Sequence, residues 1–122
     1  IRYGPRMSVN SKPNSMSEDT LMGYVTAPSM EIARMLATKL LEARLVACVN
    51  VFTGVESIYR WKGAIEMETE VLMVLKTTAD HRDAIVELVE CEHPYDVPEC
   101  IFTEVVFGNL PYLQWVHEET QA

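Results

Sequence analysis

The two longest β-like segments of the chain are neighbours, and they constrain the fold more than any other feature. Residues 45–62 (LVACVNVFTGVESIYRWK) and 65–77 (IEMETEVLMVLKT) flank Gly63, which is suited to a turn. We therefore predict one long hairpin, with a bulge or bend where Thr53-Gly54 interrupts its first arm. Strands rise about 3.3 Å per residue and helices about 1.5 Å per residue. The hairpin should therefore extend beyond any helices that pack on it.

Charge favours one register of this hairpin. Three glutamates at alternate positions share one face of the second arm, and Arg60 and Lys62 share one face of the first. Facing opposite charges contribute roughly 0.2–1 kcal/mol per pair, and a slip of one residue would reverse both faces. The register that pairs the charges sets Lys62 against Glu66, Arg60 against Glu68, Trp61 against Met67 and Tyr59 against Thr69.

Apolar periodicity and helix-capping residues predict the remaining elements. These elements are a strand over 20–26, a helix over 29–43 that Ser29 can cap, a helix from Thr78 or Asp80 to the residue before Pro94, a strand over 99–107 and a short helix from Pro111. The order strand, helix, strand, strand, helix, strand is typical of an α+β ferredoxin-like fold. We therefore predict an antiparallel sheet with two helices on one face, a long central hairpin and a short C-terminal helix.

Composition limits the organisation and the partners of the chain. The 122 residues, 48% of them apolar, fit one domain over 19–119, after a flexible polar tail over 1–18. Ten Lys and Arg against eighteen Asp and Glu give a net charge of −8, which argues against a nucleic-acid partner. No apolar run reaches the about 18 residues of a membrane helix, so we expect no membrane insertion. Three cysteines without a paired spacing favour a reducing compartment, and we expect the cytoplasm.

The stretch 90-ECEHPYDVPEC-100 raises the question of a metal or catalytic site. A zinc site built from Cys91, His93 and Cys100 would need a fourth ligand, and the usual paired spacing is absent. Cys91 and His93, two positions apart, do not face each other reliably at a helix end, so we expect no enzyme. A Cys91–Cys100 disulfide is disfavoured in a reducing cell. The stretch is first the end of a helix and the entry to a strand, and second a cation site.

Other polar and aromatic residues admit two interpretations each. Glu70 and its alternate neighbours could line a cation site, although we favour cross-strand charge pairs. Lys76 could form an ordinary ion pair or bind an anion in a cleft between subunits, and the sequence does not decide. A hairpin tip with nothing in its own chain to cover it favours a homo-oligomer, with Trp61 at the interface. The aromatic residues considered as core or interface anchors are Trp61, Tyr95, Tyr112 and Trp115.

Four blocks of the sequence resemble the CutA divalent-cation-tolerance proteins. They are LVACVNVFTGVESIYRWKGAIE, EVLMVLKTT, HPYDVPE and GNLPYLQWV, in the order and spacing of that family over about residues 22–117. The resemblance implies a ferredoxin-like homotrimer in which long hairpins reach neighbouring subunits and the sheets face the inside. It also implies a link to tolerance of copper and other divalent cations. Some members bind copper, animal relatives are connected with anchoring acetylcholinesterase at membranes, and no accepted enzymatic activity comes with the family.

The chain departs from the copper-binding bacterial members at two positions. They carry a cysteine before the Thr-Ala-Pro of the first strand, where this chain has Val25, and a His-His-Pro-Tyr block, where it has Glu92-His93-Pro94-Tyr95. We therefore expect a divalent cation, copper first, on His93 with Glu92 nearby, for sequestration or sensing and without an organic cofactor. The alternative is a non-catalytic trimeric scaffold or small-molecule sensor that uses the intersubunit cleft. The residues expected at that cleft or interface are Tyr59, Trp61, Glu70, Lys76, Tyr95, Glu99, Tyr112 and Trp115.

Overall fold

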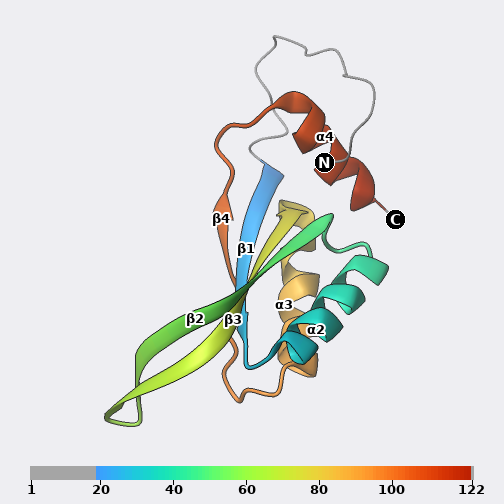
Figure 1. Cartoon of the computed structure of the whole chain (residues 1–122). Helices are drawn as coiled ribbons and strands as arrows, with labels where there is room; N and C mark the ends of the chain where they lie inside the picture. Colours follow the sequence, from blue (N-terminus) through green and yellow to red (C-terminus); the bar gives the residue numbers. More distant parts are fainter. Residues whose placement is uncertain (1–18, 122) are drawn as a thin grey trace.

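The fold is a four-stranded antiparallel sheet with two helices on one face, as predicted (Figure 1). The computed structural model describes residues 19–121, so the tail predicted over 1–18 lies outside the described residues. The elements are β1 (Thr20–Ala27), α2 (Met30–Glu42), β2 (Cys48–Trp61), β3 (Ala64–Thr78), a 3-10 turn (Ala79–His81), α3 (Arg82–Glu92), β4 (Ile101–Glu104) and α4 (Leu110–Glu119). The strand order β2-β3-β1-β4 is that of a ferredoxin-like α+β fold.

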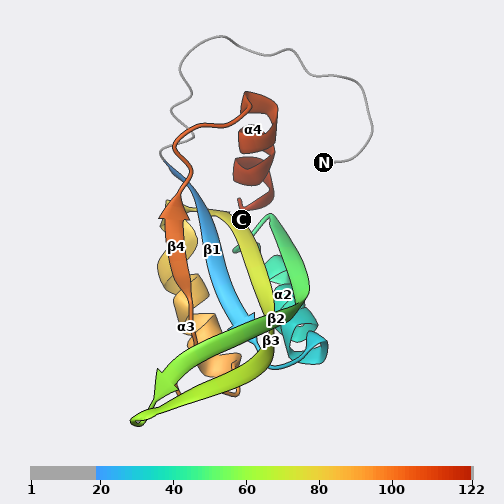
Figure 2. The same cartoon turned by 60° about the vertical axis from the view of Figure 1, so that its left-hand side comes forward.

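Both helices on the sheet begin or end where the sequence predicts. The Ser29 hydroxyl accepts a hydrogen bond from the Ile32 amide at 3.2 Å, which caps α2. The last backbone hydrogen bond of α3 runs from the His93 amide to the Val89 carbonyl, directly before Pro94. Figure 2 shows α2 and α3 side by side on the same face of the sheet. None of the helices in the described part of the chain is long and apolar enough to cross a membrane.

The core lies between those helices and the middle of the sheet. Alternate residues of β3 point toward the helices: Val71 is 6% exposed, and Met73 and Leu75 are fully buried. Further fully buried core residues come from β1, α2 and α3, namely Val25, Ala27, Ala33, Leu36, Leu40, Ile85 and Val89. The core therefore covers only the half of the hairpin that runs beside β1.

The other half of the hairpin extends past the helices (Figure 1). Its side chains on the face that continues the core are exposed: Ile58 is 61% exposed, Ile65 67% and Met67 63%. The predicted irregularity at Thr53-Gly54 is confirmed by a register shift between Phe52 and Val55. We call residues 55–61 and 64–69 the tip, and residues 48–52 and 71–78 the base.

The predicted register of the hairpin is wrong by three positions. Tyr59 faces Glu66, and Arg60 faces Ile65, so the expected pairs of opposite charges do not form. The cause is a two-residue turn, in which Lys62 and Gly63 have positive φ angles of 47° and 84°. Two positive φ angles define the turn that best matches the twist of a hairpin, and this geometry takes precedence over weak surface charge pairs.

The last strand is shorter than the predicted segment 99–107. β4 covers only Ile101–Glu104, and its ladder with β1 ends where Leu21 faces Glu104. The Val105 amide still donates to the Thr20 carbonyl at 3.0 Å, but β1 begins at that residue and offers no further partner. The chain then runs outside the sheet to α4, at the end of the sheet opposite the tip (Figure 1).

Candidate functional site

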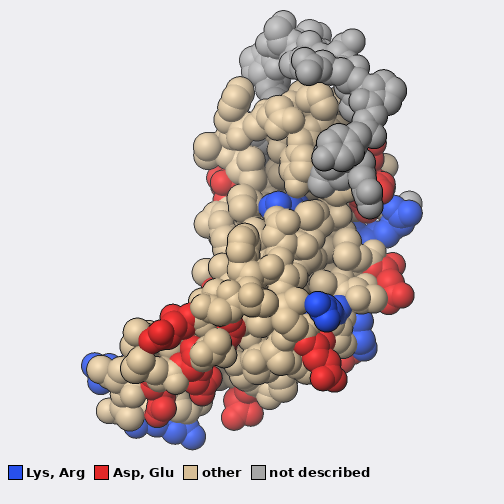
Figure 3. All heavy atoms as spheres, viewed as in Figure 1, with Lys and Arg blue, Asp and Glu red and all other residues tan. Residues whose placement is uncertain are grey.

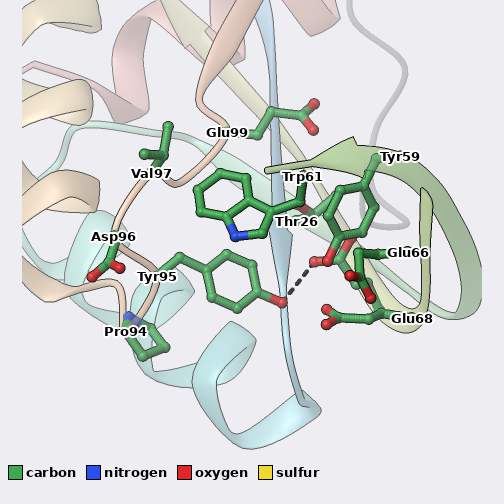
Figure 4. Close-up of a pocket in the computed structure, with 11 residues that line it drawn as sticks. Thr26, Tyr59, Trp61, Glu66, Glu68, Pro94, Tyr95, Asp96, Val97 and Glu99 are labelled. Atoms are coloured by element: carbon green, nitrogen blue, oxygen red, sulfur yellow. Dashed lines mark hydrogen bonds between the residues drawn. The ribbon is translucent and has the colours of Figure 1, made fainter. Parts of the chain in front are cut away.

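A pocket of about 490 Å³ lies between the tip and the loop that joins α3 to β4 (Figure 4). The hairpin contributes one wall, the loop contributes the facing wall, and the end of β1 contributes Thr26. The lining residues are Thr26, Tyr59, Trp61, Glu66, Glu68, Glu70, Pro94, Tyr95, Asp96, Val97 and Glu99.

The register of the hairpin decides which side chains form the first wall. Residues that face each other on adjacent antiparallel strands lie on the same side of the sheet. Because Tyr59 faces Glu66 and Val55 faces Glu70, the alternate glutamates share a side with the aromatic residues of the tip. Figure 3 shows acidic side chains gathered over the protruding part of the hairpin. The tip therefore presents carboxylates and aromatic rings to one space.

The facing wall is held in place by His93. Its Nδ1 accepts a hydrogen bond from the Tyr95 amide at 3.1 Å, so Nε2 carries the proton and donates it to the Thr26 carbonyl at 2.7 Å. The rings of His93 and Tyr95 lie 4.6 Å apart between centroids. The Tyr95 hydroxyl then donates to Oε2 of Glu70 at 2.7 Å. His93 thus fixes Tyr95, which connects the loop to the hairpin.

The environment of the pocket shifts the pKa of several groups. Burial, and then the carboxylate of Glu70, raise the pKa of the Tyr95 hydroxyl well above its usual range, which keeps it protonated as a donor. Burial and Glu70 also raise the pKa of Glu99. Partial burial and the carboxylate of Glu68 raise the pKa of Tyr59. In all three groups burial is the larger cause, and the neighbouring carboxylates add to it.

The two residues expected to bind a metal have protein partners. His93 is 7% exposed and uses both ring nitrogens, so a metal at Nδ1 would have to displace the Tyr95 amide. The Glu92 carboxylate pairs with Lys39 at 2.8 Å. Val25 is fully buried in the core. Within residues 19–121, no group of three His, Cys, Asp or Glu residues converges as metal ligands would. Metal binding by His93 and Glu92 stays a prediction.

The residues expected at one cleft divide into two groups. Tyr59, Trp61, Glu70, Tyr95 and Glu99 line the pocket.

The remaining three lie toward the other end of the sheet, around α4. The Lys76 ammonium donates to the Asn50 side-chain oxygen at 2.7 Å and lies 5.9 Å from the centre of the Tyr112 ring. Tyr112 in turn lies 5.7 Å from Trp115 between ring centroids. Lys76 therefore has an amide and an aromatic ring as its partners, and it does not contribute to the pocket.

Sequence reasoning missed part of the pocket. Glu66 and Glu68 were assigned to charge pairs on the hairpin, and Asp96 and Val97 were assigned only to the turn into the last strand. The signal that could have placed the glutamates is the Lys62-Gly63 turn, since it fixes which residues face Tyr59 and Trp61. No comparable local signal brings the loop to the hairpin.

The three cysteines are free thiols and lie outside the pocket. Cys91 is exposed at the end of α3, whereas Cys48 and Cys100 are half-buried in or beside the sheet. Burial, followed by the nearby carboxylates, raises the pKa of Cys100 to about 11, which keeps it in the unreactive thiol form.

The chain is a ferredoxin-like α+β protein with an overlong hairpin that borders an acidic, aromatic pocket. Residues 21–119 match the model of the CutA1 divalent ion tolerance protein family. The chain belongs to this family. The match spans most of the described residues, including the hairpin, the pocket and α4.

Curated relatives and solved structures agree with this assignment. The chain is 46% identical over 99 residues to "Protein CutA" of Mus musculus, which covers 81% of this chain and 56% of the mouse protein. It is 44% identical to the "Divalent-cation tolerance protein CutA" of Thermus thermophilus, over 79% of this chain and 93% of that protein. The crystal structure of CutA1 from Oryza sativa superposes with a TM-score of 0.83 at 38% identity, over 88% of this chain and 98% of that one. The chain thus spans little more than half the length of its mammalian relative.

Proposed function

We propose that the protein is a non-catalytic, cytoplasmic homotrimer that takes part in the response to divalent cations by sequestering or sensing them. The observation that carries the proposal is the protruding hairpin, which exposes apolar side chains on one face and carboxylates on the other. Membership of a divalent ion tolerance family supports the cation response. The net charge of −8 supports cations, and not nucleic acids, as ligands.

Self-association is supported by what the tip exposes. Large apolar side chains in contiguous patches are characteristic of surfaces that associate. Ile58, Ile65 and Met67 are each more than 60% exposed, and Trp61 is 43% exposed. Trp is enriched at protein interfaces, where it contributes more than its share of the binding energy. Three copies of the chain, arranged as the family resemblance implies, would cover these side chains.

A binding role is supported better than catalysis by the composition of the pocket. Its polar groups are carboxylates, two tyrosine hydroxyls, the Trp61 indole and one threonine. The His93 ring, which could act as a base, is committed to two hydrogen bonds behind the pocket wall. This arrangement favours holding a cation over activating a nucleophile.

For the divalent cation we propose copper, with His93 and Glu92 as ligands. His93 lies next to Glu92 in the chain, at the C-terminal end of α3. Binding would exchange the Tyr95 hydrogen bond on Nδ1 for a metal bond, and the Lys39 ion pair for a metal–oxygen bond. Neutral imidazole and carboxylate are suitable ligands for copper(II). The same exchange would release Tyr95 from His93, which connects this site to the pocket.

Native mass spectrometry with and without copper(II) tests the proposal. We expect a trimer that gains one copper per subunit, and we expect His93→Ala to remain a trimer without gaining copper. Glu87→Gln, an exposed carboxylate elsewhere on α3, is the matched control and should bind copper normally. A monomer would contradict the proposed assembly. A trimer without copper would contradict the metal site and favour the scaffold or small-molecule sensor.

A further inference from the structure

The C-terminal end of α3 is acidic, and its counter-charge comes from another helix. The last turn of α3 carries Glu90 and Glu92 and no basic residue. The C-terminal end of a helix has a partial negative charge, so carboxylates placed there favour a cation beside them. Lys39 of α2 supplies that cation, since its ammonium lies 2.8 Å from Oε1 of Glu92. The described residues contain no other ion pair between a basic residue and a carboxylate of α3.

The Lys39–Glu92 pair is open to solvent. The two side chains are 46% and 39% exposed. They belong to α2 and α3, which lie side by side on one face of the sheet (Figure 2), and neither residue lines the pocket at the tip. A dissolved ion therefore reaches this carboxylate without passing the contact that we propose between subunits.

An exposed ion pair holds its carboxylate weakly. Such a pair shifts an equilibrium by a factor of about five or less, because water and dissolved ions screen both charges. A divalent cation carries twice the charge of an ammonium and bonds carboxylate oxygens directly. The Glu92 oxygen that accepts from Lys39 cannot bond a metal ion in the same place, so the two cations exclude each other there.

We propose that Lys39 competes with the divalent cation for Glu92 and thereby sets the concentration at which the cation binds. This inference rests on the proposed function and deepens it, since His93 and Glu92 are the proposed ligands and Lys39 determines their affinity. At low cation concentration the Glu92 carboxylate stays paired with Lys39, which connects α3 to α2. At high concentration this connection between the helices is lost.

Competition and structural support predict effects of opposite sign. If Lys39 only holds the end of α3 in place, its removal loosens Glu92 and weakens cation binding. If Lys39 competes for the carboxylate, its removal frees an oxygen and takes away a like charge, so cation binding becomes stronger. The direction of the change therefore separates the two roles.

The test is a titration of the intact protein with copper(II), with glycine as a competing chelator and at constant ionic strength. Lys39→Met keeps an unbranched side chain and removes its charge, so we expect copper to bind about fivefold more tightly. Lys39→Arg keeps the charge and should bind copper within about twofold of the parent protein. Arg34→Met is the matched control, because Arg34 is exposed on the same helix and forms no ion pair in the described part of the chain. It should bind copper as the parent protein does.

A second substitution shows whether Lys39 acts through Glu92. In Glu92→Gln the neutral amide no longer attracts the ammonium, so adding Lys39→Met should change the copper affinity by less than about twofold. The pair is also measured without metal. The losses of melting temperature in the metal-free single and double variants should be non-additive, since the two residues form one ion pair. Added salt should reduce both this non-additivity and the gain of copper affinity.

The outcomes separate failure of the competition from failure of the metal site. Unchanged or weaker copper binding in Lys39→Met, while the parent protein binds copper, would overturn the competition and leave the metal site in place. Copper binding by neither protein would overturn both proposals. Copper binding by Lys39→Met alone would support the competition and show that Lys39 blocks the site in the parent protein. Additive melting temperatures in the metal-free variants would show that the ion pair does not form in solution, which would also overturn the competition.

Discussion

The base and the tip of the β2–β3 hairpin share one pattern of sequence and have opposite environments. On one face of β3, apolar residues occupy positions 65, 67, 71, 73 and 75, with Thr69 as the one polar residue between them. In the base these side chains are buried beneath α2 and α3, whereas Ile65 and Met67 in the tip are 67% and 63% exposed. The alternation therefore continues past the point where the chain supplies a cover.

This difference shows what alternation encodes and what it does not. Alternation assigns side chains to two faces of a strand, and the length of neighbouring elements decides which part is covered. The other face of the hairpin changes as well. Near the base it carries Lys76 and Asn50, bonded to each other, and near the tip it carries glutamates and aromatic residues. The base is buried within the subunit, and the tip leaves its large apolar side chains exposed.

The largest expected effect is a difference in the free energy of unfolding between one substitution in the core and a matched substitution in the tip. Met73→Ala removes a fully buried side chain and should lower the free energy of unfolding by about 2–5 kcal/mol. Met67→Ala, the matched change on the same face of the same strand, should cost less than about 0.5 kcal/mol in the dissociated subunit. Denaturant unfolding at concentrations low enough to dissociate any oligomer measures both values. Similar costs at the two positions would break the comparison.

The second prediction concerns assembly. Trp61→Ala should weaken association by about 2 kcal/mol or more per interface, since tryptophans dominate interface energies. Sedimentation equilibrium should then show dissociation at concentrations where the parent protein forms the proposed trimer. Glu87→Ala, an exposed change on α3 away from the hairpin, should leave the association constant unchanged. If Trp61→Ala remains a stable trimer, Trp61 is not an interface anchor.

Two glycines give a third, smaller contrast. A Cβ at Gly63 in the turn would meet no atom within 4 Å, but the φ angle of 84° is unfavourable for alanine. Gly63→Ala should therefore cost about 1 kcal/mol, all of it from the backbone.

At Gly23, beside the base, the cost of an alanine comes from side-chain packing and not from the backbone. A Cβ at Gly23 would lie 2.9 Å from the Phe102 ring and 3.2 Å from Leu75. Gly23→Ala should cost about 1–3 kcal/mol from overpacking. In Gly23→Ala, a shorter side chain at Phe102, such as Phe102→Leu, should recover part of the stability. No substitution of a neighbouring side chain should recover the cost of Gly63→Ala. Thermal unfolding of the variants tests both statements.

Local rules were sufficient for the elements and the topology. Ser29 caps α2, Pro94 follows the end of α3, and the order of elements predicted the ferredoxin-like sheet. The predicted register of the hairpin was wrong because surface charges were given more weight than the Lys62-Gly63 turn. The predicted length of the last strand was wrong because its partner β1 begins at Thr20. The β propensity of one strand does not show where its partner strand ends.

The pocket could be predicted only in part, because it joins segments distant in sequence. Trp61 and Tyr95 were expected at one cleft and lie there together. The metal role of His93 was expected from the family resemblance. Its two hydrogen bonds to Tyr95 and Thr26 depend on how the loop packs on β1, and no local pattern encodes that packing.

The smallest expected effect is a pH dependence of opposite sign at the two ends of the hairpin. Near the tip, burial and Glu70 raise the pKa of Glu99, so its contribution to stability is present at low pH and is lost as pH rises through the folded pKa. After the base, the hydrogen bond from Thr78 lowers the pKa of Asp80, so its contribution is present near neutral pH and is lost in acid. Glu99→Gln should therefore raise the melting temperature near pH 7, and Asp80→Asn should lower it.

The pH at which each difference disappears identifies its cause. In acid, below the pKa of both states, the parent carboxyls are neutral, so each variant should approach the melting temperature of the parent protein. Both groups are largely exposed, and added salt should reduce the part of each difference that comes from neighbouring charges. An Asp80→Asn difference that survives in salt belongs to the Thr78 hydrogen bond. A Glu99→Gln difference that vanishes in salt belongs to the neighbouring charge of Glu70, which ties the pH response near the tip to that carboxylate.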